Sequence, residues 1–82
     1  MRPAQDFNRA LGDVVREALA EARVPQREAC LRTGIALTTL QRRMLGTSPF
    51  SVDELRSLAT VAGTTDTSLL AAAGARVEGS AA

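Results

Sequence analysis

This chain of 82 residues has no histidine, lysine, tryptophan or tyrosine, and its single cysteine is Cys30. One cysteine cannot form a disulfide within the chain, and the cysteine and histidine spacings that hold zinc are absent. Without histidine, the side chain most often used for proton transfer in catalysis is missing. A glycine-rich phosphate-binding loop is missing as well. We therefore expect a protein that is not an enzyme and that uses no metal or cofactor.

Long hydrophobic runs are also missing. No apolar segment approaches the roughly 20 residues that a membrane-spanning helix needs. The residues that follow Met1 do not form the apolar core of a signal peptide. We expect a soluble, intracellular protein with no membrane contact. The length and a hydrophobic content of 45% fit one small domain with a single modest core.

Acidic residues are scarce in the middle of the chain. Residues 1–25 hold four arginines and four acids, residues 26–50 hold four arginines and one acid, and residues 51–82 hold two arginines and four acids. The middle third therefore carries four minus one, or +3, although the whole chain carries only +1. A local basic patch on a nearly neutral chain indicates a polyanion bound by one face. The alternative is a solvated arginine face without a partner.

Helical periodicity runs through most of the sequence. Apolar residues recur every three or four positions from Phe7 onward, which predicts an amphipathic helix. Four further helical segments are bounded by proline or glycine, the residues that start and end helices. We predict an all-α, compact five-helix domain over residues 1–74 and a flexible C-terminal tail over residues 75–82. The predicted helices cover about residues 5–22, 25–33, 37–45, 52–62 and 67–73.

Several details of these helices are specific enough to compare with a structure. Ser51 and Glu54 have the Ser-x-x-Glu spacing of a capping box, which predicts the start of a helix. We expect Val52 to share the inward face of that helix with the apolar residues that follow it. Gly74 should end the last helix. Cys30 should be a packed core residue, since reactive cysteines need an exposed, electropositive setting.

Residues 26–46, QREACLRTGIALTTLQRRMLG, contain two short predicted helices joined by a tight turn at Gly34. This segment resembles the helix-turn-helix motif of phage-repressor-like, Cro/C1-type regulators, whose second helix lies in the DNA major groove. Cys30 occupies the small-residue position where the two helices cross. Ile35 and Leu40 occupy core positions of the motif.

The resemblance covers most of the chain and implies a lambda-repressor-like domain with the motif over about residues 25–46. The run RRMLGTSPFSVDELRSLA also looks like the repressors of actinobacterial phages, which implies the cytoplasm of a bacterial host cell. Three residues depart from the family pattern. Pro25 and Ala36 stand where hydroxyl caps usually begin the two helices, and Arg43 stands where an aliphatic residue is more common. We expect Met44 to take over the inward role.

The exposed side of the second motif helix is expected to read DNA bases. Arginine can donate two hydrogen bonds to guanine O6 and N7, and glutamine can pair with adenine N6 and N7. At the start of the first motif helix, exposed N–H groups and the helix dipole favour a phosphate. The residues expected to contact bases are Leu37, Thr38, Gln41 and Arg42. The residues expected to contact the DNA backbone are Gln26, Arg27, Thr39, Arg43, Thr47 and Ser48.

The leading hypothesis is a sequence-specific transcriptional regulator that binds double-stranded DNA, a phage repressor or Cro-like protein acting by operator occupancy. It needs no cofactor, and no small-molecule effector is evident. A two-fold operator would require a homodimer, whose surface we place at Leu69, Leu70 and Val77. Two alternatives stay open. One is a protein-interaction module on the same fold, such as an antitoxin or transcription adaptor; the other is a phage architectural or recombination-directionality factor.

Overall fold

In the computed structural model, which describes residues 3–81, the chain forms five α-helices. No strand occurs within these residues, so the prediction of an all-α, five-helix fold is confirmed. The first four helices begin and end within about two residues of their predicted bounds. Among the described helices, none is both long enough and apolar enough to cross a membrane. The helices are α1 (Pro3–Glu21), α2 (Gln26–Thr33), α3 (Leu37–Leu45), α4 (Val52–Val61) and α5 (Asp66–Ala81).

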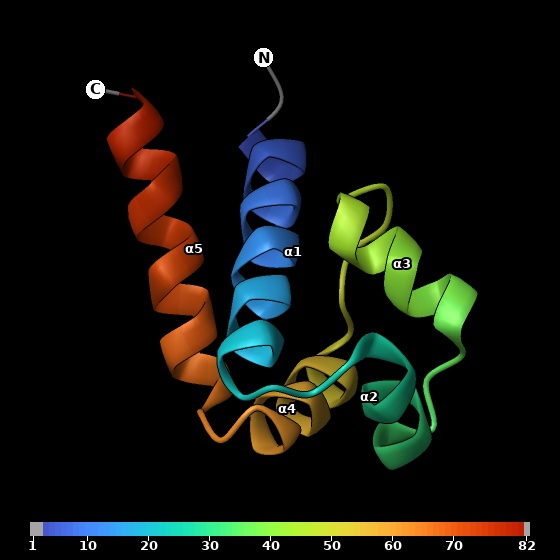
Figure 1. Ribbon diagram of the computed structural model, residues 1–82. Helices are drawn as coiled ribbons and strands as arrows, with labels where there is room; N and C mark the ends of the chain where they lie inside the picture. Colours follow the sequence, from blue (N-terminus) through green and yellow to red (C-terminus); the bar gives the residue numbers. More distant parts are fainter. Residues whose placement is uncertain (1–2, 82) are drawn as a thin grey trace.

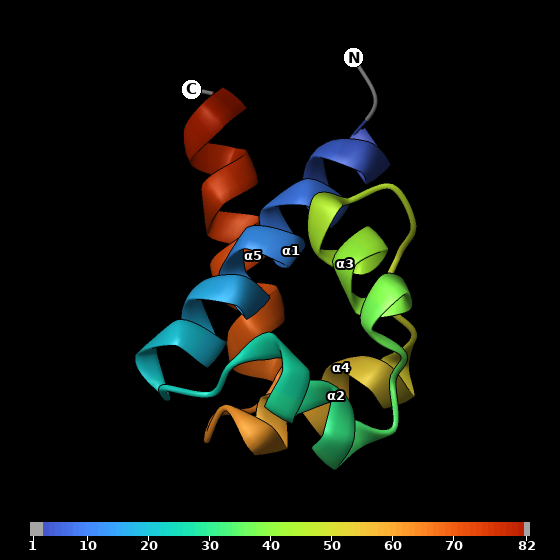
Figure 2. The same cartoon turned by 45° about the vertical axis from the view of Figure 1, so that its right-hand side comes forward.

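The longest helix, α1, lies between α5 and α3 and packs against both (Figure 1). α5 runs antiparallel to α1, so the start of α1 and the end of α5 lie at the same end of the molecule. α2 and α4 pack against each other at the opposite end, and the view in Figure 2 shows the same order. α1 is therefore the element against which both α3 and α5 are placed.

The core forms where the inner faces of the five helices meet. Leu19, Leu40 and Leu58 are each at most 2% exposed, and none of the described polar or charged residues is buried. Burying a large apolar side chain contributes roughly 1.5–3 kcal/mol, so this cluster is the main source of stability. The buried residues are Leu11, Val14, Val15, Leu19, Val24, Ala29, Leu40, Met44, Leu55, Leu58, Ala59, Leu69 and Ala73.

Gly34 ends α2 and starts the turn to α3, as predicted. Its φ is 78°, in the left-handed region that only glycine adopts without strain, and its N–H donates to the Cys30 carbonyl at 2.8 Å. The chain then enters α3 after only two more residues, Ile35 and Ala36. Gly34 therefore fixes the short connection between the two helices.

Val52 does not face the core, contrary to prediction. It is 70% exposed, whereas Leu55, Leu58 and Ala59 on the same helix are buried. Its spacing puts Val52 on the same side of α4 as Leu55 and Ala59. However, it is the first residue of the helix, directly after the loop, where its side chain stays exposed.

α5 continues past Gly74, where it was predicted to end, through most of the predicted flexible tail at residues 75–82. The predicted helix end at Gly74 is therefore wrong. A glycine inside a helix costs only about 1 kcal/mol. Contacts beyond it compensate, because Val77 is half-buried and Arg76 forms an ion pair with Glu17 of α1.

α1 and α3 approach each other at backbone distance. A Cβ atom at Gly12 would stand 2.9 Å from the Cα of Met44 and still closer to its carbonyl group. At the end of α3, a Cβ at Gly46 would stand 2.8 Å from the Cα of Arg9. The C-terminal end of α3 therefore rests directly on the backbone of α1. Nothing in the sequence pattern distinguishes Gly12 from an ordinary glycine inside a helix.

We expect Gly12→Ala to lower the free energy of unfolding by about 2 kcal/mol, because the added methyl group meets the Met44 backbone and displaces α3. Gly74→Ala is the matched control. It also lies within a helix, but a Cβ there meets nothing within 4 Å, so this variant should gain about 0.5–1 kcal/mol. Urea denaturation followed by circular dichroism measures both. Equal effects in the two variants would contradict the close approach of α1 and α3.

Candidate nucleic-acid interface

α3 has one buried face and one exposed face. Leu40 and Met44 are 0% and 2% exposed and point into the core, so Met44 takes the expected inward role. Thr38, Arg42 and Leu45 lie on the side of α3 opposite Leu40, and Gln41 lies at the edge of that side, since each residue turns the helix by about 100°. The exposed residues are Thr38, Gln41, Arg42 and Leu45.

Three of the four predicted base-contacting residues lie on this exposed face: Thr38, Gln41 and Arg42. The fourth, Leu37, is half-buried and lies on the same side of α3 as Leu40 and Met44, three and seven residues further on. Thr47 donates a hydrogen bond to the carbonyl oxygen of Arg42 at 3.0 Å, which uses the backbone of Arg42 and leaves its side chain free. The structure therefore brings a guanidinium, an amide and a hydroxyl group together on one accessible helix face.

The starts of α2 and α3 have no side-chain cap. Pro25 and Ala36 occupy the capping positions, and neither side chain accepts a hydrogen bond from the first turn. Backbone N–H groups in the first turn of a helix lack partners within the helix, so these groups remain open to an external acceptor. Two predicted backbone contacts lie at the start of α2, where Gln26 is half-buried and Arg27 is exposed. A third, Thr39, is half-buried on α3.

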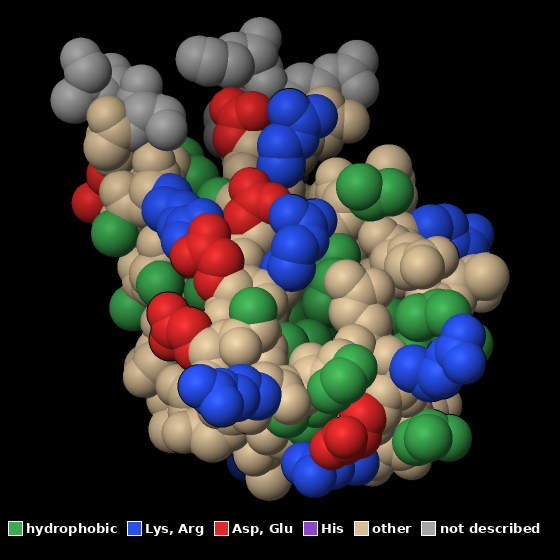
Figure 3. Space-filling model, in the orientation of Figure 1, with side chains coloured by type: hydrophobic (Ala, Val, Ile, Leu, Met, Phe, Trp, Pro, Cys, Tyr) green, Lys and Arg blue, Asp and Glu red, His purple; other side chains and the backbone are tan. Residues whose placement is uncertain are grey.

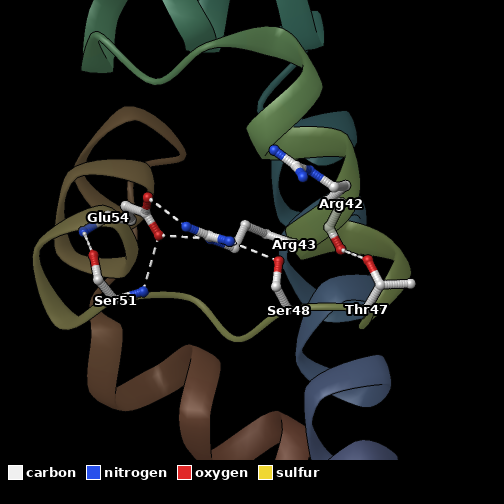
Figure 4. A network of polar contacts seen from close by, with 6 residues as sticks. All are labelled: Arg42, Arg43, Thr47, Ser48, Ser51 and Glu54. Carbon is white, nitrogen blue, oxygen red and sulfur yellow. Dashed lines mark hydrogen bonds and ion pairs between the residues drawn. The ribbon is translucent and has the colours of Figure 1, made fainter.

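The side chain of Arg43 extends from the end of α3 toward the start of α4 (Figure 4). Its Nε donates to Glu54 Oε1 at 3.0 Å, its Nη2 approaches Oε2 at 3.4 Å, and its Nη1 donates to Ser48 Oγ at 2.6 Å. The side chains of Arg43 and Glu54 are only 23% and 19% exposed. Arg43 and Ser48 were predicted to contact the DNA backbone. In the structure their side chains bond to each other, and Arg43 also bonds to Glu54.

The carboxylate of Glu54 also completes the capping box with Ser51, so the predicted capping box is confirmed. Glu54 Oε1 accepts from the Ser51 N–H at 2.9 Å, and Ser51 Oγ accepts from the Glu54 N–H at 3.1 Å. The hydrogen bond from Arg43 is the main reason that the pKa of Glu54 lies below its usual value, and partial burial opposes this effect. The sequence indicated the cap but gave no signal that Arg43 joins it.

The described arginines divide into paired and unpaired groups. Five form ion pairs with acidic residues: Arg16 with Asp13, Arg32 with Glu28, Arg43 with Glu54, Arg56 with Asp66, and Arg76 with Glu17. Four have no acidic partner in the described part of the chain: Arg9, Arg23, Arg27 and Arg42. In Figure 3, red acidic side chains gather mainly over α1 and α5, and blue side chains without red ones lie over α3. Unpaired positive charge is therefore available around α2 and α3.

Cys30 and Leu69 can also be compared with prediction. Cys30 is half-buried and packs against the core, and the adjacent Ala29, at 0% exposure, is the fully buried small residue of α2. Leu69 is 4% exposed and belongs to the core, so it does not form a dimer surface. Leu70, at 40%, and the half-buried Val77 remain at the surface.

No protein-family model, curated protein or solved structure matches the chain. Within the described residues, no group of three or more His, Cys, Asp or Glu side chains is arranged to hold a metal ion.

We expect Glu54→Gln to lower the free energy of unfolding at neutral pH by about 1 kcal/mol, through loss of the charge-assisted bonds to Arg43. The folded-state pKa of Glu54 is lowered. Its contribution to stability is therefore fully present above the unfolded pKa and is lost as the pH falls through the folded pKa. Urea unfolding at neutral and acidic pH should show a weaker acid dependence in the variant than in the parent.

Asp53→Asn serves as the control for Glu54→Gln. It removes the same charge from the first turn of α4, but Asp53 forms no ion pair in the described structure. Some acid dependence should survive in the Glu54 variant, because a hydrogen bond from Arg76 also lowers the pKa of Glu17. If both variants show the same pH curve, the link between Arg43 and Glu54 does not contribute to stability.

Proposed function

We propose that this protein is a sequence-specific, double-stranded-DNA-binding transcriptional regulator that acts by occupying its operator. The observation that carries the proposal is the exposed face of α3, which presents Thr38, Gln41 and Arg42 without an acidic side chain on that helix. Together with its resemblance to phage-repressor-like regulators, this supports a repressor or Cro-like role in the cytoplasm of a bacterial host cell.

In this proposal α3 enters the major groove, which is wide enough to admit an α-helix. Arg42 donates its two parallel N–H groups to guanine O6 and N7, and Gln41 pairs with adenine N6 and N7. Thr38, one turn earlier, bonds to a base edge or a phosphate. Leu45 is 62% exposed on the same face, and contact with a thymine methyl group would cover it.

Phosphate contacts at the start of α2 would set the position of α3 in the groove. The open N–H groups of the first turn and the positive end of the helix dipole both favour an anion there. Arg27 adds a full positive charge that no acidic residue of the described chain neutralises. Contacts of this kind fix orientation and carry no sequence information, so they complement the base contacts of α3.

A protein-interaction module remains the second candidate because of Leu31. This residue of α2 is 82% exposed, the largest exposure among the large hydrophobic side chains of the described structure. The proposed DNA contact would explain why Leu45 is exposed, but it does not explain the exposure of Leu31. Salt dependence separates the two functions, since the logarithm of DNA affinity falls against the logarithm of salt concentration with a slope of about −0.9 per phosphate contact.

The test is selection of bound duplexes from a random-sequence pool, followed by affinity measurements on the enriched sequence. We expect Arg42→Ala to weaken binding by about 1–3 kcal/mol and to relax the preference at one base position. Arg56→Ala on α4 is the control, because it removes the same charge from another helix. A uniform loss on all sequences would reassign Arg42 to the DNA backbone. Failure of the parent to bind any duplex would leave the interaction module as the better candidate.

A further inference from the structure

Arginines recur every seven residues along the first part of the chain, at Arg2, Arg9, Arg16 and Arg23. Arg2 lies outside the described residues. Seven residues make almost two helical turns, so Arg9 and Arg16 share one side of α1, about 20° apart around the helix and about 10 Å apart along its axis. Arg23 follows in the turn just after the helix ends at Glu21. We call Arg9, Arg16 and Arg23 the α1 arginine row.

The middle member of the α1 arginine row is tied to α3. Arg16 Nη1 donates to Asp13 Oδ1 at 3.0 Å, and its Nη2 reaches the carbonyl oxygen of Met44 at 3.5 Å. The outer members, Arg9 and Arg23, are exposed and have no acidic partner within the described chain. The row therefore presents two free guanidinium groups around one that is held against α3.

Both ends of the row lie beside the proposed DNA-binding elements. The backbone of Arg9 lies directly against Gly46, at the end of α3. At the other end, Arg16 and Arg23 line an open pocket of about 370 Å³ together with Gln26, the first residue of α2. Gln26 is one of the predicted DNA-backbone contacts. The row thus continues the basic surface from the end of α3 to the start of α2.

Acidic residues occupy the neighbouring side of α1. Asp6, Asp13, Glu17 and Glu21 follow the helix on the side toward α5, and Figure 3 shows red side chains over α1 on that side and blue ones toward α3. A polyanion would be repelled from the acidic side and attracted to the arginine side. The charge on α1 therefore directs such a ligand toward α3.

We propose that the α1 arginine row binds the sugar-phosphate backbone of the same duplex whose major groove receives α3. This inference rests on the proposed function and extends the interface beyond α2 and α3 to α1. Arg9 and Arg23 contact phosphates, and Arg16 holds the row against the end of α3. Because phosphates are the same in every sequence, these contacts strengthen binding to all duplexes equally.

The test compares two double variants that remove the same charge. The first combines Arg9→Ala with Arg23→Gly. Arg23 has a φ of 59°, a conformation in which glycine is more favourable than arginine, so this change should not unfold the protein. The control combines Arg56→Ala with Arg76→Ala, whose arginines are paired with acids away from α3. Thermal melting of both variants establishes that they are folded.

Affinity for a short random-sequence duplex is then measured over a range of salt concentrations. We expect the slope of log affinity against log salt to become shallower by about 1.8 in the row variant, 0.9 for each lost phosphate contact, and to stay unchanged in the control. Preference for the selected sequence should be retained in both.

Equal slopes in the row variant and the control would overturn the role of the row. If the Arg42→Ala variant still lost sequence preference in that case, the proposed function would stand without this extension. Absence of duplex binding by the parent would overturn both proposals together. These outcomes are therefore distinguishable within one set of measurements.

Discussion

The contact between the backbones of α1 and α3 is the constraint on which the rest of the structure depends. Only a residue without a side chain at position 12 lets the carbonyl group of Met44 approach α1. Given that approach, α3 needs only Leu40 and Met44 to anchor it in the core, since both are almost completely buried. The remaining side of a nine-residue helix is left free for polar side chains. A small chain can thus support an exposed helix with very little apolar surface.

A second contact secures α3 from the other side. Arg43 and Glu54 connect the end of α3 to the first turn of α4, and the same carboxylate caps α4. Partly buried, charge-assisted bonds of this kind are directional, so they fix the orientation of a helix end as well as its distance. Adjacent arginines in the sequence consequently have different surroundings. Arg43 is used within the fold, while Arg42 stays available to a ligand.

Local signals predicted most of the fold. Gly34 and the pair Ser51 and Glu54 marked helix ends correctly because capping is decided by residues a few positions apart. Predictions failed where distant contacts decide the outcome. Gly74 did not end α5, because contacts with α1 stabilise the helix beyond it, and Val52 found no neighbour to cover it. The sequence predicted the candidate site on α3. It did not predict the contacts that hold α3 in place, which are those of Gly12 with Met44 and of Arg43 with Glu54.

The sequence alone predicted five helices, the approximate bounds of the first four and the concentration of positive charge near α2 and α3. These properties follow from periodicity, capping residues and composition, which act over short stretches of chain. Three features became visible only in the packed molecule: Arg43 bonds to Glu54, Gly12 must lack a side chain, and Arg16 of α1 reaches α3. Each of these contacts joins residues that are distant in sequence and meet only when the helices pack. Local sequence patterns extend over a few residues and therefore do not predict such contacts.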